Sequence, residues 1–547
     1  MLRGRRAGAE RGNRQHVVAS TDPPNANLLV SIAAVFGVDL DRFGMSPKDA
    51  VVMSLAVFLA VALVAAATLN AAQPGSLIEA VNRGDTAAVR RLLGEGARVD
   101  ASEPDGSTAL HWAVRHDRVA IVEALLEAGA RADTATRYGV TPLALAAENG
   151  SAPVLKRLLQ AGADPHASGP DGETVLMLAA RTGRPDAVRV LLAHGVDANA
   201  REGWQGETAL MWAAGHDHPE VVRLLAAHGA DLNARSATPE YPKVTVDLAT
   251  MVTTALPRGG LTPLMFAARQ GAGGAARALV EVGADPNLTE PDGMTALVNA
   301  IINAHYDVAA LLIEEGADPN IADAAGMTPL YVAVDMQHQE PLINRPLPKP
   351  SGRLGAGDVV RRLLEHGADP NAALRTPLLM RQHNAGDPQL AQGATPLMRA
   401  AKVSDVALMR LLLDHGANPN ARLANQTTPL MIAAARGGRN AGPEQQTIDA
   451  VDALLARGAD LHATNANGET ALHVAVGRGD ALVRFLAERG ARLDARDKFG
   501  RTPLDVALGA PGGGGQGRGG GPAEPGPVRE STAALLRELM RARGLAP

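Results

Sequence analysis

The sequence predicts an all-α solenoid in which short helix–turn–helix units stack one on the next. A Thr-x-Leu motif recurs eleven times, at Thr108, Thr141, Thr174, Thr208, Thr262, Thr295, Thr328, Thr395, Thr428, Thr470 and Thr502. Successive motifs are 33, 33, 34, 54, 33, 33, 67, 33, 42 and 32 residues apart. A sustained period of 33 is typical of repeat architectures. Aromatic residues make up only 2% of the chain, so the core must be built from Leu, Ala and Val, which suits small stacked helices.

Each repeat can be interpreted as two helices. Thr is a good N-cap, because its hydroxyl accepts a hydrogen bond from a free N–H of the first turn. Proline follows the Thr in six motifs, at the first helical position, where a missing N–H costs nothing. A second segment carries paired leucines such as Leu158-Leu159 and ends at a Gly suited to the left-handed C′ position. One such unit cannot bury its apolar face alone, so neighbours must stack.

This repeated sequence pattern resembles the ankyrin repeat family over residues 75–508, and a further closing helix is expected near the end of the chain. The resemblance implies about ten full repeats between an N-terminal and a C-terminal cap, with loop insertions. It also implies a concave groove that binds other proteins. In the family, the His of Thr-Ala-Leu-His ties neighbouring repeats together, and His111 and His473 match that place. Trp112 and Trp212 follow at a core position of the family and are expected to fill the stack.

Residues 1–72 lie outside the repeat. Residues 1–47 are expected to be a disordered basic tail, and residues 48–72 a transmembrane signal-anchor or a signal peptide. Ala50 to Leu69 is an uncharged run of twenty residues, long enough to cross a membrane. The positive-inside rule then places the repeats in the periplasm or outside the cell, anchored to an inner membrane. If translation begins at Met45, the run would instead be a cleavable signal peptide, and the repeats would be released. A third interpretation is that the run forms a buried helix packed on the first repeat.

Five stretches interrupt the period. Insertions are expected at residues 236–260, 337–357, 375–393 and 437–446, and residues 509–527 form a Gly- and Pro-rich linker. Residues 528–547 then supply a C-terminal capping helix with Leu535, Leu536 and Leu539 facing the stack. Insertions in solenoids map to surface loops, where they either decorate a binding face or are simply tolerated.

Residues that carry catalytic chemistry are not apparent. The chain has no Cys, which excludes a thiol nucleophile, and no phosphate-binding loop, dinucleotide fingerprint or nucleophile elbow is present. His194, His228, His366 and His415 each precede a terminating Gly, which predicts a structural role at a helix end. His216-Asp217-His218 is the one cluster of potential metal ligands, and it is too small to predict a site. No cofactor and no metal are therefore expected.

The sequence favours a protein partner over a nucleic acid. Removing residues 1–72 removes seven basic and five acidic residues, which changes the net charge from −5 to −7 and disfavours a polyphosphate partner. A single monomeric array is expected. The resemblance places the variable ends of the first helices and the loop tips on the groove, and Tyr138 and Trp204 stand out there as aromatic residues that the repeat does not require. The predicted partner-binding residues are Arg115, His116, Arg137, Tyr138, Glu148, Asn149, Arg181, Thr182, Trp204, Gln205, His216, Arg269 and Gln270.

The function that follows is a noncatalytic scaffold for protein–protein interaction, binding through the groove and the loop tips. Two alternatives remain at this point. One is a dedicated stabilising or inhibitory partner of a single exported enzyme. The other is an enzyme whose site is built from the insertions, although each insertion is too short for a domain of typical size.

Overall fold

A computed structural model describes residues 76–238, 259–338, 348–376, 390, 392–435, 443–511 and 526–546. The chain divides into two compact units, Met1–Glu79 and Ala80–Pro547, and of the first only residues 76–79 are described. The predicted basic tail, the predicted membrane segment Ala50 to Leu69 and most of the inserted residues lie outside the described ranges. Within those ranges, no helix combines the length and the apolar character needed to cross a membrane.

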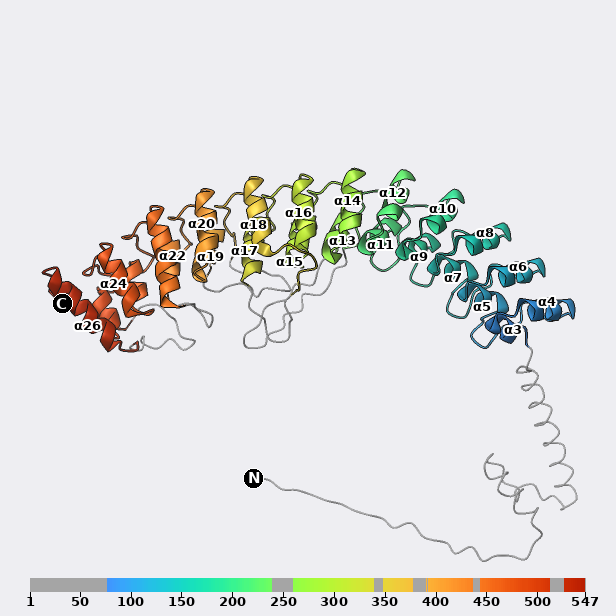
Figure 1. Cartoon of the computed structure of the whole chain (residues 1–547), viewed down its shortest axis with the longest axis horizontal. Helices are drawn as coiled ribbons and strands as arrows, with labels where there is room; N and C mark the ends of the chain where they lie inside the picture. The colour runs from blue at the N-terminus through green and yellow to red at the C-terminus, as the bar shows by residue number, and fades with distance from the viewer. Residues whose placement is uncertain are drawn as a thin grey trace, which may run out of the picture. The chain divides into compact units, whose positions relative to one another are not determined.

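Ten helix pairs follow the order that the motifs predict (Figure 1). They are α5 Ala109–Arg115 and α6 Val119–Glu127, α7 Pro142–Glu148 and α8 Ala152–Gln160, α9 Val175–Thr182 and α10 Pro185–Ala193, α11 Ala209–Gly215 and α12 Pro219–Ala227, α13 Pro263–Gln270 and α14 Gly273–Glu281, α15 Ala296–Ile302 and α16 Tyr306–Glu314, α17 Pro329–Gln337 and α18 Ala356–Glu365, α19 Pro396–Lys402 and α20 Val406–Asp414, α21 Pro429–Ala434 and α22 Glu444–Ala456, and α23 Ala471–Ala475 and α24 Asp480–Glu488. Helices α3 Leu77–Arg83 and α4 Thr86–Gly94 precede them, and α25 Pro503–Ala507 and α26 Glu530–Ala542 follow.

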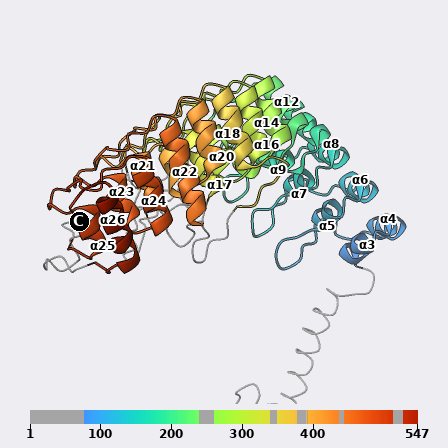
Figure 2. The same ribbon diagram turned by 60° about the vertical axis from the view of Figure 1, so that its left-hand side comes forward.

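The pairs form two parallel rows within the second unit (Figures 1 and 2). Each first helix packs against the first helix of the next pair, from α5 through to α25, and each second helix packs against the next second helix, from α4 through to α26. No extended strand occurs among the described residues, where the β-structure is limited to two isolated bridges. The prediction of an all-α ankyrin-type array is confirmed.

The motif residues act as the sequence predicts. The hydroxyl of Thr141 accepts a hydrogen bond from the N–H of Ala144 at 3.1 Å, and Thr174, Thr208 and Thr262 cap their helices in the same way. Gly162 has φ +89°, a left-handed conformation that ends α8 and that a residue with a side chain rarely adopts. Leu191, Leu210, Ala213 and Ala214 are fully buried. The core is therefore Leu, Ala and Val, as the composition indicates.

An asparagine ladder joins consecutive units beside the ends of the second helices. Asn199 donates from Nδ2 to the carbonyl of Gly229 at 2.8 Å and accepts the N–H of Asp231 at 2.7 Å. Asn371 makes the same two contacts, with Gly416 at 3.0 Å and Asn418 at 2.7 Å, although an insertion follows it in the sequence. The stack is thus continuous across its insertions, since the same contacts recur on both sides of them.

The regular helices occupy part of the stretches expected as insertions. Helix α18 begins at Ala356, inside the stretch 337–357, and α22 begins at Glu444, inside 437–446. Arg375, at the edge of 375–393, donates its N–H to the carbonyl of Ala325 at 2.8 Å and so belongs to the regular loop frame. Helix α26 packs on α24 and α25, with Leu536 fully buried. The remainder of the Gly-rich stretch falls in residues 512–525, outside the described part of the chain.

Candidate protein-binding face

The predicted partner-binding residues lie on one face of the second unit, formed by the ends of the first helices and by the loops that precede them. We call it the first-helix face. Most of these side chains are exposed, and only Thr182 is half-buried. Asn149 donates to the carbonyl of Val114 in the preceding unit at 2.7 Å, and the Thr182 hydroxyl donates to the carbonyl of Ala179 in its own helix at 2.8 Å. Asn149 therefore helps to join neighbouring units.

The loops are joined by backbone hydrogen bonds that we call loop rungs. In each rung an N–H of one loop donates to a carbonyl of the loop before it. The eight rungs are Arg137 to Asp105, Gly203 to Asp171, Ala237 to Gln205, Ala324 to Asp292, Arg375 to Ala325, Ala424 to Gln392, Ala466 to Asn425 and Lys498 to Asn467, at 2.6 to 2.9 Å. Two junctions in the described part lack a rung, and there a proline, Pro170 or Pro291, occupies the donor position. Proline has no N–H to donate, which explains both gaps.

Tyr138 and Trp204 project from loop tips whose backbones are fixed. Their side chains are 66% and 75% exposed. The buried carboxylate of Glu202 accepts the N–H groups of Trp204 and Gln205, each at 2.6 Å, and of Glu207 at 3.0 Å. Next to Tyr138, the N–H of Arg137 donates to Asp105 at 2.7 Å. A partner would therefore meet two aromatic side chains on a backbone that needs little further ordering.

Arginine and aromatic side chains alternate along the ends of the first helices. The Arg115 guanidinium lies 5.7 Å from the ring centre of Trp112, and that of Arg181 lies 5.5 Å from Trp212 in the next unit. Arg181 also pairs with Glu148 at 3.3 Å, one unit back. Cation–π contacts of this kind attach the arginines to the face while leaving their donors accessible.

The expectation that Trp112 and Trp212 fill the core is wrong. Both side chains are half-buried. Trp112 donates from Nε1 to the carboxylate of Glu103 at 2.8 Å. The Nε1 of Trp212 is buried without a hydrogen-bond partner, although the Glu207 carboxylate is close enough to interact with it. Burial, with the nearby Glu202 carboxylate, raises the pKa of Glu207 above its ordinary value.

His111 and His473 join neighbouring repeats, as the resemblance implies. The N–H of Thr108 donates to Nδ1 of His111 at 3.2 Å, which leaves the proton of the neutral ring on Nε2. Nε2 then donates to the carbonyl of Val140 in the next unit at 3.2 Å. His473 contacts Thr470 and Arg501 in the same pattern. Burial lowers the pKa of both imidazoles, which favours the neutral form that this geometry needs.

The remaining histidines that the sequence singles out are also held by the fold. The Nδ1 atoms of His194, His228, His366 and His415 each contact the carbonyl four residues earlier, at 2.8 to 2.9 Å. In the cluster at 216–218, His216 contacts the carbonyl of Trp212, Asp217 accepts the N–H of Ala275, and His218 contacts the carbonyl of Arg181. No group of three His, Asp or Glu side chains in the described ranges is arranged to hold a metal ion.

Sequence reasoning missed two features of this face. Phe499 is a third loop-tip aromatic, 49% exposed, and it stands three residues before its motif Thr as Tyr138 does. That shared position was a signal that could have found it. The second feature is a buried ion pair, Arg399 Nε to Asp335 Oδ1 at 2.6 Å, between α19 and α17. The two residues are far apart in the sequence, so no local pattern marks them as partners.

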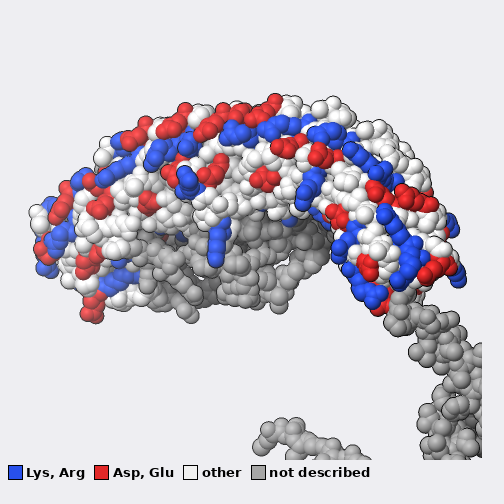
Figure 3. Space-filling model, turned by 45° about the vertical axis from the view of Figure 1, so that its right-hand side comes forward, with Lys and Arg blue, Asp and Glu red and all other residues white. Residues whose placement is uncertain are grey.

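Charges of both signs are interspersed over the face shown in Figure 3. Many are cross-unit pairs between second helices, such as Arg157 with Glu123 at 2.8 Å and Arg223 with Glu281 at 2.7 Å. No broad basic surface appears on the described part of that face.

The stacked pairs, the capped motifs and the loop rungs together define a repeat solenoid. A family model described as ankyrin repeats in three copies matches residues 77–169, 145–236, 264–342, 376–442 and 441–512, and a single ankyrin repeat model matches residues 325–373. These matches cover well over half of the chain, which therefore belongs to the ankyrin repeat family. Domains of this family are generally noncatalytic and typically act as protein-binding scaffolds.

Among solved structures, the chain is similar to the human ASB11 ankyrin repeat domain. The identity is 26%, the alignment covers 45% of this chain and 99% of that chain, and the TM-score is 0.37. Among curated proteins, none matches this chain.

Proposed function

We propose that this protein is a noncatalytic scaffold that binds another protein on the first-helix face of its uninterrupted units, residues 107–233. The observation that carries the proposal is the pair of loop-tip aromatics, Tyr138 and Trp204. Both are large and exposed, yet neither contributes to the core or to a cap. Tyr and Trp are the residues that most often anchor protein interfaces, because they bury much area at a low entropic cost.

The charged residues around these anchors supply specificity. Arg115, Arg181 and Arg269 occupy the same position at the ends of three first helices, and all three are exposed. Exposed interfacial charges steer association and select partners more than they add affinity. The partner-binding set predicted from the sequence is retained as the proposed contact surface, with Asn149 and Thr182 acting also within the fold.

The test is partner capture from the native membrane fraction by crosslinking and pull-down. We expect Tyr138→Ala and Trp204→Ala to weaken capture, since an anchoring aromatic contributes about 2 kcal/mol or more. Their free energies of unfolding should stay within about 0.5 kcal/mol of wild type, as is usual for exposed positions. Phe499→Ala is the matched control, because it removes a loop-tip aromatic outside the uninterrupted block. Capture that is unchanged in the Tyr138/Trp204 double variant, or lost equally in Phe499→Ala, would contradict this placement.

The export of the array is part of the same proposal. It rests on the apolar run Ala50 to Leu69 and on the basic residues before it. External protease should digest the repeats in spheroplasts as readily as in lysates. Protection in spheroplasts with digestion in lysates would refute export without affecting the binding face. Recovery of one stoichiometric exported enzyme would identify a dedicated partner, whereas several weak ones would identify a general scaffold.

A further inference from the structure

A cavity opens in the first-helix face between α7 and α9, at one of the two junctions without a loop rung. Pro170 stands at the donor position there, so the carbonyl of Tyr138 receives no rung from it. At the other proline junction, the guanidinium of Arg235 bridges the gap, donating to the carbonyls of Gly260 at 3.2 Å and Thr289 at 2.6 Å. No arginine bridge of this kind is found at Pro170 within the described residues, and the gap there stays open.

The motif of α7 leaves this gap unfilled. Ala144 is the third residue after the motif Thr, where the other ten repeats carry His, Met, Val, Tyr or Asp. A long side chain in that place would project into the junction, whereas alanine leaves a cavity of about 70 Å³. Two local sequence choices, Pro170 and Ala144, therefore produce the same opening.

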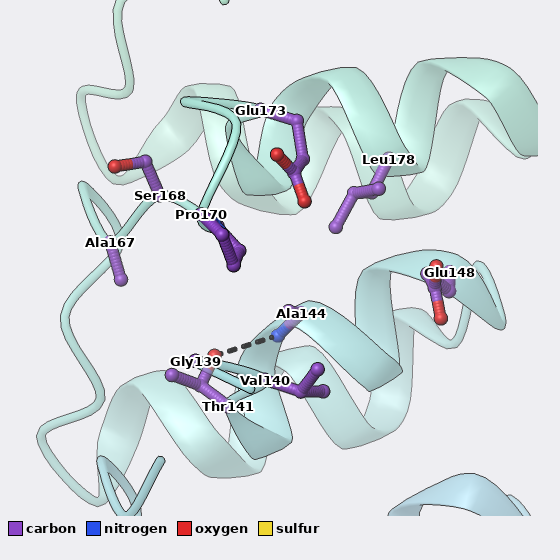
Figure 4. A pocket seen from close by; sticks show the side chains of 11 residues that line it. Gly139, Val140, Thr141, Ala144, Glu148, Ala167, Ser168, Pro170, Glu173 and Leu178 are labelled. Atoms are coloured by element: carbon purple, nitrogen blue, oxygen red, sulfur yellow. Dashed lines mark hydrogen bonds between the residues drawn. The ribbon is translucent and has the colours of Figure 1, made fainter. Parts of the chain in front are cut away.

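Figure 4 shows what surrounds the cavity. Val140, Thr141 and Ala144 of the α7 unit form one side. The other side is formed by Leu178 of α9 and by the loop before α9, which contributes Pro170 and the carboxylate of Glu173. Glu148, at the end of α7, supplies a second carboxylate to the lining. The walls are thus mainly apolar, and the ionisable groups that line the cavity are both acidic.

The two carboxylates retain acceptor capacity. Glu173 accepts one hydrogen bond, from the N–H of Asp171 at 3.2 Å, and a carboxylate has room for about four. Glu148 pairs with Arg181 at 3.3 Å, but both side chains are about half exposed, so that pair is weak and replaceable. In the neighbouring units Arg115 and Arg181 occupy the helix position of Glu148, which makes this junction locally acidic within a row of arginines.

We infer that this cavity binds a lysine side chain of the partner protein. The apolar walls match the methylene stem, which favours burial, while the ammonium reaches the carboxylate of Glu173. The cavity of about 70 Å³ exceeds the roughly 10–15 Å³ that one water needs, so it admits the end of a lysine side chain, with the first methylenes lying along its rim. Arginine is longer and carries a wider planar head. The inference deepens the proposed function, because it names the side chain that would dock beside Tyr138.

The test does not require the partner. The full chain, labelled at alanine, leucine and valine methyl groups, is titrated with N-acetyl-lysine N-methylamide, with its norleucine analogue and with its arginine analogue, and followed by NMR. We expect saturable shifts of the Ala144, Leu178 and Val140 methyl signals with the lysine compound. Binding of the norleucine compound should be at least about tenfold weaker, because it lacks the ammonium. Equal binding of lysine and norleucine compounds, or shifts at other junctions only, would overturn the inference.

Three variants sharpen the result. Glu173→Gln preserves shape and should remove the preference for lysine over norleucine. Ala144→Met places the residue common in other repeats into the cavity and should abolish the shifts at Leu178. Pro170→Ala supplies the missing N–H and should weaken binding by letting the rung to Tyr138 form. Unfolding midpoints confirm that each variant is folded, and unchanged lysine binding in folded Glu173→Gln and Ala144→Met would refute the site.

Failure of this inference is distinguishable from failure of the proposed function. If capture of a partner depends on Tyr138 and Trp204 but is unaffected by Ala144→Met, the scaffold function stands and the lysine site is wrong. If the lysine compound binds beside Ala144 but partner capture is unchanged by substitution of Tyr138 and Trp204, the lysine site is supported and the proposed binding face must be revised.

Discussion

The uninterrupted units α5 to α12 and the interrupted units α17 to α20 share one backbone arrangement but differ on the first-helix face. At the fifth residue of the motif, the first group carries Trp112, Leu145, Leu178 and Trp212. The second group carries Val332 and Arg399, both buried. The asparagine ladder and the Thr caps are the same in both groups. The repeat motif therefore determines the arrangement of the helices, whereas the side chains on the first-helix face vary between units.

The polar residues of the interrupted units form a connected group. Arg399 bonds Asp335 and also donates to the carbonyl of His338 at 3.1 Å. His338 Nε2 in turn lies 2.8 Å from the carboxylate of Asp405. The hydrogen bond from His338, together with its charge, holds the pKa of Asp405 below its ordinary value. Arg399 of the interrupted units is thus buried and satisfied within the fold, whereas Trp112 and Trp212 at the same motif position stay half-buried.

The largest expected effect comes from breaking the buried pair of the interrupted units. Arg399→Met should lower the free energy of unfolding by about 3–5 kcal/mol, because it removes one member of a buried ion pair. The double variant Arg399→Met/Asp335→Leu should recover most of that loss, since apolar residues often replace a buried pair at little cost. Urea unfolding measures both. A double variant no more stable than the single one would show that the charges themselves are required there.

The next effect concerns the core, which both regions share. Leu191→Ala in α10 should cost about 2–5 kcal/mol, because Leu191 is fully buried and its truncation leaves a cavity. Arg189→Ala on the same helix is the matched control. It is exposed, and its pair with Asp186 is a surface contact, so its cost should stay within about 0.5 kcal/mol. Equal losses in urea unfolding would contradict the assignment of the buried row.

A smaller effect tests whether insertions weaken the frame. Asn199→Ala lies at an uninterrupted junction and Asn371→Ala at one followed by an insertion, and each variant loses two hydrogen bonds. We expect each to cost about 1–3 kcal/mol, and the two costs to agree within about 0.5 kcal/mol. A much smaller cost for Asn371→Ala would mean that the stack is already loosened at the insertion.

The smallest expected effect is a pH dependence carried by the repeat-joining histidines. Burial lowers the pKa of His111 and His473 below the ordinary 6.5, so the unfolded chain binds protons that the folded chain does not. Stability should therefore be full above pH 6.5 and fall as the pH drops from there toward the folded pKa. His111→Met/His473→Met, which installs the residue of other repeats, should flatten this part of the profile of unfolding midpoint against pH. An unchanged slope would assign the dependence to other groups.

The sequence by itself determined the order of the helix pairs and the two caps. A Thr before each first helix, proline after six of these Thr residues, paired leucines and a terminating Gly act within a few residues of one another, so a period of 33 is enough to predict ten pairs and two caps. The histidines at helix ends and the loop-tip positions of Tyr138 and Trp204 follow from the same local rules.

Tertiary structure alone decided which side chains meet and which stay exposed. Arg399 and Asp335 are 64 residues apart, and Trp112 is half-buried rather than in the core, because the stacking of helices determines which side chains meet. The cavity between α7 and α9 also needed the structure. Ala144 departs from the other repeats in the sequence, but it and Pro170 open a cavity only because stacking places them on opposite sides of one junction. Local periodicity determines the backbone, whereas contacts between repeats determine the surface, since those contacts depend on side chains that the period does not constrain.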